Sequence, residues 1–429
     1  MEIYAAHADF TKGEAFFKMS RIREDADKII AEALRAALPD TAVAKALEGR
    51  EFGPGRLVMV AVGKAAWQMA STACAILGDK IDEGLVVTKY GHSKGELPHT
   101  RIIEAGHPVP DANSFAATAE AIKLVENLTA DDTVLFLLSG GGSALFEKPL
   151  IPTEELEDIT KQLLACGANI VEMNTLRKRL SAVKGGRFAQ YCAPAKVFSV
   201  VLSDIIGDPL DMIASGPAYP DSSTCEQAQA IVKRYNLKLS PEAMAFLSQE
   251  TPKSLDNVET QITGSVRQLC AAAEKVCRGL GYEPVVLTAE LSCTARDAGS
   301  FLGAIARTHK DTEKSLAYIA GGETVVHLTG HGLGGRNQEI ALAAAPLLDG
   351  VKDAAVFSVG SDGTDGPTDA AGGYCDGETM EALRAKGIDV TAVLADNDAY
   401  HALKECNGLI ITGPTGTNVN DLTVLLLRR

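Results

Sequence analysis

The sequence predicts an α/β protein built from two domains. Short apolar runs alternate along the chain with stretches of helical periodicity, and these runs are continuous rather than interrupted by polar residues. Such strands are typical of a mostly parallel sheet that is covered by helices on both faces. A length of 429 residues allows two or three domains, each with a full core.

The first half of the chain contains the elements of one such domain. Helical periodicity extends over residues 14–47, with Pro39 as a break. Strands are predicted at 57–62, 85–88, 101–104, 134–138 and 196–202, and helices at 66–77, 114–128, 153–166 and 174–180. The stretch 239–257 has mixed helical and loop character with two prolines. We therefore expect a first domain over residues 1–245 and a second over 246–429.

The second half repeats the alternation without repeating the sequence. Helices are predicted at 265–280, 295–309, 337–348, 378–386 and 398–404. Strands are predicted at 284–288, 316–320, 324–328, 356–359 and 408–412. The two halves therefore look like two different α/β domains.

Composition excludes several classes of partner. The formal charge of −15 argues against nucleic acid and against anionic membranes, because both require a basic surface. The N-terminus lacks a basic region followed by an apolar one, and no apolar run approaches membrane-spanning length. The nine cysteines are scattered, with no C-x-x-C pair, which favours reduced thiols. We expect a cytoplasmic protein.

The stretch 356–373, VFSVGSDGTDGPTDAAGG, is the first candidate for a functional site. An apolar strand ends there in three aspartates, Asp362, Asp365 and Asp369, interleaved with glycines. Open α/β sheets bind ligands at the carboxyl ends of their strands, and carboxylates on a glycine-rich turn suit Mg²⁺. Asp362 and Asp365 are therefore candidate metal ligands, although a single Asp-Gly turn is often only a polar loop.

Three loops of the first half could hold an anion. Lys64 follows a strand directly before a helix, where a bound phosphate would also meet the positive end of that helix. Residues 139–143 read SGGGS after a strand, so bare backbone N–H groups can approach a phosphate closely. A second glycine pair follows Lys184. The candidate contacts in these loops are Lys64, Ser139, Gly140, Gly141, Gly142, Ser143 and Lys184.

Two aspartates add to the polar residues in the loops of the first half. Asp204 stands at the end of the strand 196–202, and Asp208 follows four residues later. Either carboxylate could contact a metal or act as a general base, and either could merely cap a helix. We regard Asp204 as a candidate catalytic residue and Asp208 as a candidate metal ligand.

Residues 330–335, GHGLGG, formally match the dinucleotide motif G-x-G-x-x-G after a strand and before a helix. The next acid at a strand end, Asp362, lies farther along than the expected spacing of ~20 residues. Arg336 and Asn337 open the following helix, and an arginine there suits a carboxylate or phosphate. Asn418, in the Gly-, Thr- and Asn-rich stretch 412–421, is a further candidate contact.

Taken together, nine motifs of the chain resemble those of the class II glycerate 2-kinases. The last four of them, from residue 321 onward, resemble the MOFRL domain of that family. The match follows the family's order over nearly the whole chain. The shared motifs are GKAA at 63–66, GHPVPD at 106–111, LLSGGGSALF at 137–146, NTLRKRLSAVKGGRFA at 174–189, LSDIIGDPLDMIASGP at 202–217, GGET at 321–324, GGRNQEIALAAA at 334–345, SDGTDGPTDAAG at 361–372 and TGPTGTNVNDL at 413–422.

The resemblance implies an N-terminal Rossmann-like doubly wound sheet and a smaller C-terminal α/β domain with the MOFRL region at about 316–422. It implies ATP-dependent phosphorylation of D-glycerate to 2-phosphoglycerate with Mg²⁺, in the cleft between the domains. Lys64 and Arg336 match the lysine and arginine that the family places in that cleft. The chain departs from the family at residues 292–296, SCTAR, where a Gly-Glu-Ala-Arg sequence is expected, and at Val266, where a polar residue is common.

The resulting hypothesis places the ATP phosphates on the loop 139–143, with Lys64 and Lys184 countering their charge. Some of Asp204, Asp208, Asp362 and Asp365 hold Mg²⁺. Arg336 grips the glycerate carboxylate or the transferred phosphoryl group. Phosphoryl transfer needs chiefly this kind of positioning and charge neutralisation.

Other functions stay open from the sequence alone. The glycine motif at 330–335 would suit an NAD(P)H-dependent hydroxypyruvate reductase. The departure at 292–296 would suit a kinase of a related hydroxy acid, and a non-catalytic sensor of sugar acids or nucleotides is a third option. Each of these functions involves a small-molecule ligand, which is D-glycerate in the leading hypothesis. The sequence also allows a homodimer.

Overall fold

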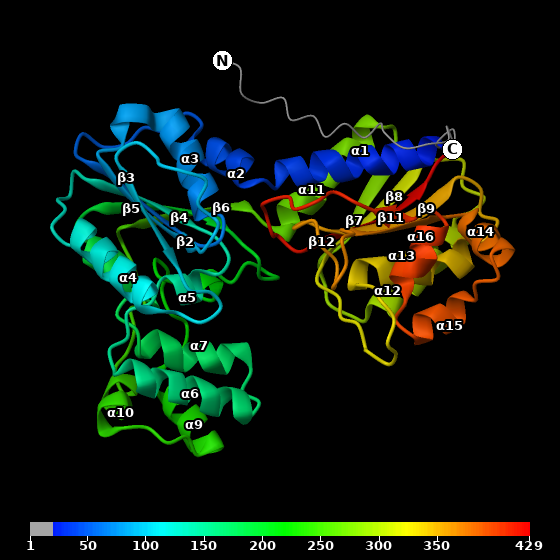
Figure 1. Cartoon of the computed structure of the whole chain (residues 1–429). Coiled ribbons are helices and arrows are strands. Elements are labelled where there is room, and N and C mark those ends of the chain that lie inside the picture. The colour runs from blue at the N-terminus through cyan, green and yellow to red at the C-terminus, as the bar shows by residue number, and fades with distance from the viewer. Residues whose placement is uncertain (1–19) are drawn as a thin grey trace.

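The computed structural model describes residues 20–429, which form two six-stranded sheets in two separate bodies (Figure 1). The first six residues of the helical stretch expected at 14–47 lie outside the described residues. So does the N-terminal segment from which we argued against a targeting sequence.

The first sheet has the order β3-β2-β1-β4-β5-β6 and is parallel throughout. Its strands are β1 (Leu57–Val62), β2 (Glu83–Lys89), β3 (Thr100–Ala105), β4 (Thr133–Leu138), β5 (Lys196–Leu202) and β6 (Val258–Gly264). The helices α2 (Pro39–Leu47), α3 (Ala66–Leu77), α4 (Ala112–Val125) and α8 (Arg187–Cys192) supply apolar side chains to the cores on its two faces. This is the doubly wound arrangement that the apolar runs predicted.

A small helical cluster lies beside this sheet and has a core of its own (Figure 1). It consists of α6 (Thr153–Ala165), α7 (Ile170–Arg179), α9 (Cys225–Tyr235) and α10 (Pro241–Leu247). Two shorter helices, α5 (Gly142–Leu145) and η2 (Ile213–Ser215), pack against each other, and η1 (Gly78–Lys80) follows α3. We had expected mixed helix and loop where α10 lies.

The second sheet has the order β11-β10-β9-β12-β8-β7 and is mixed. Its strands are β7 (Glu283–Leu291), β8 (Leu316–Gly322), β9 (Ala354–Gly360), β10 (Gly372–Asp376), β11 (Leu409–Ile410) and β12 (Asp421–Leu427). The pair β7 and β8 is parallel, whereas β12 runs antiparallel to both β8 and β9. The expectation of a mostly parallel sheet is therefore wrong here.

Helices cover both faces of the second sheet. One face carries α1 (Arg21–Ala36) and α11 (Val266–Gly279). The other carries α12 (Ala295–Thr308), α13 (Arg336–Leu348), α14 (Thr379–Ala385), α15 (Val390–Ala395) and α16 (Ala399–Glu405). Residues 324–328 form no strand, because the chain leaves the sheet at the end of β8, and Val325 makes only an isolated bridge to Thr294.

The chain passes between the two bodies twice. Helix α1 packs on α11 of the second sheet, although it comes first in the sequence, and α2 then joins the first sheet (Figure 1). Strand β6 lies in the first sheet and α11 in the second, so the second crossing falls at residues 264–265. The boundary expected at residues 245 and 246 is thus too early, and helix α1 belongs by its packing with the C-terminal half.

No helix within residues 20–429 is long and apolar enough to cross a membrane. All nine cysteines are free, and Cys270 and Cys277 are buried in the core between α11 and the second sheet. Burial raises the pKa of each of these two thiols to about 12, so they act as small apolar core residues.

Candidate active site

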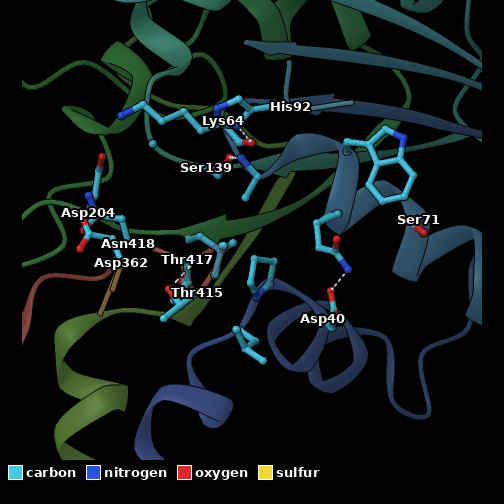
Figure 2. Close-up of a pocket in the computed structure, with 18 of the residues that line it drawn as sticks. Asp40, Lys64, Ser71, His92, Ser139, Asp204, Asp362, Thr415, Thr417 and Asn418 are labelled. Carbon is cyan, nitrogen blue, oxygen red and sulfur yellow. Dashed lines mark hydrogen bonds between the residues drawn. The ribbon is translucent and has the colours of Figure 1, made fainter. Parts of the chain in front are cut away.

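A cavity of about 710 Å³ lies between the two bodies. Residues of both contribute to its wall: the ends of β1, β4 and β5 and the start of α2 from the first, and the loops after β9 and before β12 from the second. Figure 2 shows Asp204, Asp362 and Asn418 grouped at one end, with the Lys64 side chain extending over them, and Asp40 and Ser71 at the other end. The carboxyl ends of strands therefore meet here, as expected for an open α/β sheet.

Lys64 is placed by the pairing of two neighbouring strands. Because β1 and β4 lie side by side, the backbone N–H of Lys64 reaches the carbonyl of Gly140 at 2.9 Å. The Ser139 hydroxyl accepts a bond from the N–H of Ala65 at 3.1 Å. His92 contacts the Lys64 carbonyl at 3.0 Å. These contacts fix the turn and leave the Lys64 side chain exposed to the cavity.

Neighbouring side chains approach the backbone of the loop 139–143 so closely that two of its positions require glycine. A Cβ on Gly140 would lie 2.2 Å from a carboxylate oxygen of Asp204, which the end of β5 brings alongside. Gly141 has φ +87°, and a Cβ there would meet the His107 ring at 3.1 Å. Ser139 and Gly140 line the cavity, whereas Gly141, Gly142 and Ser143 lie behind it. Ser143 bonds the hydroxyl of Ser215 at 3.0 Å instead.

Lys184 does not reach the cavity, contrary to our prediction of a cofactor contact. Its side chain is fully buried, and its ammonium donates to the carbonyls of Ser143 at 2.8 Å and Phe146 at 2.9 Å. Glu147 completes the site with an ion pair of 3.1 Å. Burial lowers the pKa of Lys184 and the Glu147 charge opposes this. Lys184 therefore fixes the turn that follows the glycine loop.

Asp204 stands at the acidic end of the cavity (Figure 2). It lines the cavity, and within residues 20–429 no cation forms an ion pair with it. Burial raises the pKa of Asp204, the charge of Lys64 lowers it, and Glu323 of the second body raises it further. Asp362 lines the same end of the cavity, with one oxygen accepting bonds from the N–H and hydroxyl of Thr364 at 2.9 and 3.0 Å.

The other two predicted metal ligands have different positions. Asp208 does not line the cavity, and Arg267 of the second body lies 4.0 Å from its carboxylate. Asp365 is 3% exposed and accepts the N–H groups of Asn337 at 3.1 Å and Gln338 at 2.8 Å. It therefore caps the N-terminus of α13. Burial raises the pKa of Asp365 to about 6.

Arg336 is held by two carboxylates of its own body. Its Nε and Nη2 donate to Asp421 at 2.5 and 3.1 Å, and its Nη1 donates to Glu323 at 2.8 Å. Burial lowers the pKa of Arg336, but these carboxylates outweigh burial and raise it. A guanidinium has five N–H donors, so two remain for a ligand. Asn337, predicted to bind a cofactor, is 1% exposed and bonded to Asp365 and Ser358, so it is a core residue.

Asn420 joins the two bodies beside this cluster. Its amide nitrogen lies 3.2 Å from the backbone carbonyl of Asp204 and 3.3 Å from a carboxylate oxygen of Glu323. Glu323 is in turn bonded to Arg336. Arg336 is therefore linked to Asp204 through Glu323 and Asn420, although its own side chain does not line the cavity.

The glycine motif 330–335 contributes no site for a dinucleotide. Its backbone N–H groups at Gly330, His331 and Gly332 donate to residues 396–398 at 3.0, 2.9 and 2.8 Å. A Cβ on Gly330 would meet the backbone of Asp396 at 2.3 Å. The glycines thus allow this loop to pack against the turn between α15 and α16, and the N–H groups of its first four residues, 330–333, are already bonded. The motif does not line the cavity.

Several residues of the cavity wall had escaped the sequence analysis. Trp67 and Gln68 lie on α3, where helical periodicity hides them, and Asp40 lies at the break between α1 and α2. Gln68 donates to Asp40 at 2.7 Å, which joins α3 to the start of α2. Asp40 lies in the first turn of α2, just after the chain has crossed from the second body to the first. By contrast, Asn418 lines the cavity, together with the neighbouring residues 415–417, and its contact with a cofactor stays a prediction.

Comparisons with known proteins agree with this architecture. Residues 25–248 match a family described as "Domain of unknown function (DUF4147)", and residues 316–421 match the MOFRL family. The chain is 49% identical to D-glycerate 2-kinase of Thermotoga maritima over 96% of this chain and 100% of the relative. It is 39% identical to glycerate 2-kinase of Pyrococcus horikoshii over 95% and 97%.

A solved structure shows the same fold over nearly the whole chain. The crystal structure of glycerate kinase from Thermotoga maritima superposes with a TM-score of 0.91, covering 95% of this chain and 99% of that one. The match includes both bodies, and with them the walls of the cavity. The chain therefore belongs to the glycerate 2-kinase family with the MOFRL domain.

Proposed function

We propose that this protein transfers the γ-phosphoryl group of ATP to the 2-hydroxyl of D-glycerate, giving 2-phosphoglycerate and ADP. The observation that carries the proposal is the cavity between the two bodies, where Lys64, a glycine loop and two carboxylates converge. Relatives named glycerate 2-kinase at 49% and 39% identity support it.

ATP fits this cavity with its phosphates at the end near Gly140. The exposed Lys64 ammonium offsets phosphate charge there, in a turn whose backbone is fixed by Ser139. The opposite end is lined by Leu38, Pro39 and the half-buried Trp67 ring. An aromatic and apolar wall of this kind suits a purine base, so we place the base there.

Mg²⁺ fits the acidic end of the cavity. Magnesium in kinase sites is held by one or two carboxylates together with phosphate oxygens. Asp362 presents a carboxylate at this end, with one oxygen engaged by Thr364 and the other free of contacts within the described residues. When bound, the ion would neutralise charge that develops on the transferred group.

The acceptor lies, in this proposal, between Asp204 and the cluster of Arg336 and Glu323. The two N–H groups left on Arg336 would bind the glycerate carboxylate, which an arginine fork matches in shape. Asp204 would accept the proton of the 2-hydroxyl, because burial has raised its affinity for a proton. Asn420 contacts both Asp204 and Glu323, so it would hold Asp204 at a fixed position relative to the Arg336 and Glu323 cluster across the cleft.

A coupled assay of ADP release tests this function. Purified protein with ATP and Mg²⁺ is offered D-glycerate, L-glycerate and other short hydroxy acids, since residues 292–296 depart from the family. We expect ADP release with D-glycerate above all others. Equal turnover of another hydroxy acid would assign a different acceptor, and no ADP release with any acceptor would refute a kinase.

The same preparation tests the reductase. Two relatives from Agrobacterium vitis carry the provisional name hydroxypyruvate reductase at 39% and 38% identity. Because the backbone N–H groups of the glycine motif are bonded to residues 396–398, we expect no oxidation of NADH or NADPH by hydroxypyruvate. Loss of nicotinamide absorbance at a rate above that of ADP release would reverse the assignment.

A further inference from the structure

One end of the cavity carries a carboxylate of which the protein uses only one oxygen. Asp40 lies in the first turn of α2, is half-buried and lines the cavity. Its Oδ1 accepts a hydrogen bond from the side-chain amide of Gln68 at 2.7 Å, and the Thr72 hydroxyl lies 3.2 Å from the same oxygen (Figure 2). Within residues 20–429, the other oxygen, Oδ2, has no hydrogen-bond partner and Asp40 forms no ion pair.

The amide that binds Asp40 is itself oriented by a cation. Gln68 accepts a hydrogen bond at its Oε1 from the Lys94 ammonium at 3.3 Å. Because the amide oxygen faces an ammonium and the amide nitrogen faces a carboxylate, the orientation of the Gln68 side chain is defined. Oδ1 of Asp40 is therefore occupied by the protein, and Oδ2 is the acceptor that remains for a ligand.

An aromatic ring lies beside this acceptor. Trp67 precedes Gln68 on α3, is half-buried and lines the same end of the cavity with Leu38 and Pro39. The indole Nε1 of Trp67 donates to the carbonyl of Gly95 at 2.8 Å, which holds the ring in place. A fixed aromatic ring next to a single polar acceptor suits a planar base that stacks on the ring and is recognised at one edge.

The single free oxygen favours adenine over guanine. Adenine presents one exocyclic amine, whereas guanine carries a carbonyl in the same place. Guanine also has two adjacent donors, a ring N–H and an amino group, which a carboxylate binds best with both of its oxygens. Because Gln68 occupies Oδ1 of Asp40, this two-oxygen contact is not available. A guanine carbonyl in the position of the adenine amine would meet Oδ2 as a second acceptor, without a proton between them.

We propose that Asp40 determines the specificity for the nucleotide base, and that its Oδ2 accepts a hydrogen bond from the exocyclic amine of an adenine that stacks beside Trp67. This inference rests on the proposed function, which places the base of ATP at this end of the cavity. Gln68 and Thr72 are positioning residues, since they hold the Asp40 carboxylate without contacting the base.

Inosine triphosphate provides the matched substrate, because it carries a carbonyl in place of the exocyclic amine of ATP. With D-glycerate and Mg²⁺, we expect kcat/KM of the wild type to be roughly 10- to 100-fold higher for ATP, which corresponds to one hydrogen bond to a charged group. In Asp40→Asn the amide oxygen can still accept from Gln68, and the amide nitrogen replaces Oδ2 with a donor. This variant should lose the preference for ATP and gain turnover with inosine triphosphate.

Tryptophan fluorescence gives a second readout that does not depend on turnover. The chain contains one tryptophan, Trp67, so its emission reports on this end of the cavity. ADP with Mg²⁺ should quench the emission at lower concentration than inosine diphosphate, and Asp40→Asn should reverse this order. Asp79→Asn is the matched control, because Asp79 is fully exposed on η1 outside the cavity wall, and it should behave as the wild type.

The two readouts distinguish the base contact from the reaction. If Asp40→Asn weakened both nucleotides equally, or left their ratio unchanged, Asp40 would be a structural residue and the inference would be wrong. An emission that neither nucleotide alters would also overturn it. In each of these cases ADP release with D-glycerate would still support the kinase. The absence of ADP release, together with the expected order of quenching, would refute the proposed function and retain the adenine contact.

Discussion

Lys64 and Asp204 come from strands that are separated by β4 in the first sheet, and each has a role set by its surroundings. Lys64 is exposed to the cavity on a turn whose backbone is bonded to Gly140. Asp204 is half-buried, forms no ion pair with a cation of residues 20–429, and lies against Gly140 from the other side. In the proposed function, Lys64 therefore offers charge to a phosphate and Asp204 offers a base to a hydroxyl.

Replacing Lys64 by methionine keeps the length of the side chain and removes its charge. We expect kcat to fall by roughly 3 orders of magnitude or more, by analogy with the arginine fingers of other phosphoryl transferases. Steady-state ADP release measures this. Lys233→Met, at an exposed position on α9, should retain full activity. Near-wild-type kcat in Lys64→Met would remove Lys64 from the mechanism.

We expect the ionisation of Asp204 to determine how the enzymatic activity depends on pH. A general base must be ionised, and burial raises the pKa of Asp204, so activity should fall as the pH decreases through that raised value. The acidic limb of the profile of kcat/KM should therefore lie above the pH range of an ordinary carboxylate. Asp204→Asn should lower kcat sharply and abolish this limb. Asp362→Asn should keep the limb and raise the Mg²⁺ concentration needed for half-maximal rate.

Asp365 contributes to stability rather than to the reaction. Its pKa is about 6 in the folded chain and 3.8 in a free side chain, so the folded state binds the proton more tightly. The contribution of this group is fully present below the unfolded pKa and is lost as the pH rises through ~6, by roughly 3 kcal/mol in total. Asp365→Asn keeps a cap on α13 and lacks this dependence.

Urea unfolding of the wild type and Asp365→Asn, compared at pH 5 and pH 8, measures the effect. The variant should gain stability relative to the wild type as the pH rises. Asp365→Ala, which also removes the cap, should be less stable than Asp365→Asn by about 1 kcal/mol. A difference between wild type and Asp365→Asn that is the same at both pH values would contradict the raised pKa.

At the scale of elements, the short helix α5 depends on a buried cation. The Lys184 ammonium binds the carbonyls of Ser143 and Phe146 and the carboxylate of Glu147. Lys184→Met leaves Glu147 as an unpaired buried charge, for which a loss of about 3 to 5 kcal/mol is expected. The double change Lys184→Met with Glu147→Gln should recover part of this loss.

Thermal unfolding of these two variants separates a structural role from the cofactor contact that the sequence predicted. A structural Lys184 lowers the unfolding temperature, and the KM for ATP in the folded fraction changes little. An unchanged unfolding temperature together with a greatly raised KM for ATP would restore Lys184 to the binding site.

Local sequence patterns located the helices and strands that are long and strongly periodic. The strands at 57–62 and 196–202 and the helix beginning at Ala295 were predicted to within a few residues. Strand β12 was missed, because its run of apolar residues follows a loop that we interpreted by its polar residues alone. Its antiparallel direction is a property of long-range pairing, which local periodicity does not contain.

At the scale of the whole molecule, the sequence could give candidate site residues but not their grouping. Lys64, Gly140, Asp204, Asp362 and Asn418 were singled out because they follow apolar strands, and all five line one cavity. Asp365 shares that setting in the sequence, and Lys184 was singled out for the glycine pair that follows it, but both are buried and bonded to neighbouring loops. Which polar residue at a strand end faces the ligand depends on tertiary packing.

The packing of helix α1 is another feature that local sequence could not predict. An amphipathic helix at residues 21–36 is evident from its periodicity, yet nothing local indicates that it packs on the second sheet rather than on the first. The chain crosses to the first body directly after α1, and Leu38, Pro39 and Asp40 of the cavity wall follow there. Domain assignment by position along the chain therefore missed part of the site.

The most direct test of the account is the identity of the product. Protein, ATP, Mg²⁺ and D-glycerate are incubated, and the phosphorylated product is assigned by ³¹P and ¹H NMR. We expect stoichiometric ADP and 2-phosphoglycerate, with product formation abolished in Asp204→Asn. Formation of 3-phosphoglycerate, or of no phosphorylated glycerate at all, would contradict it.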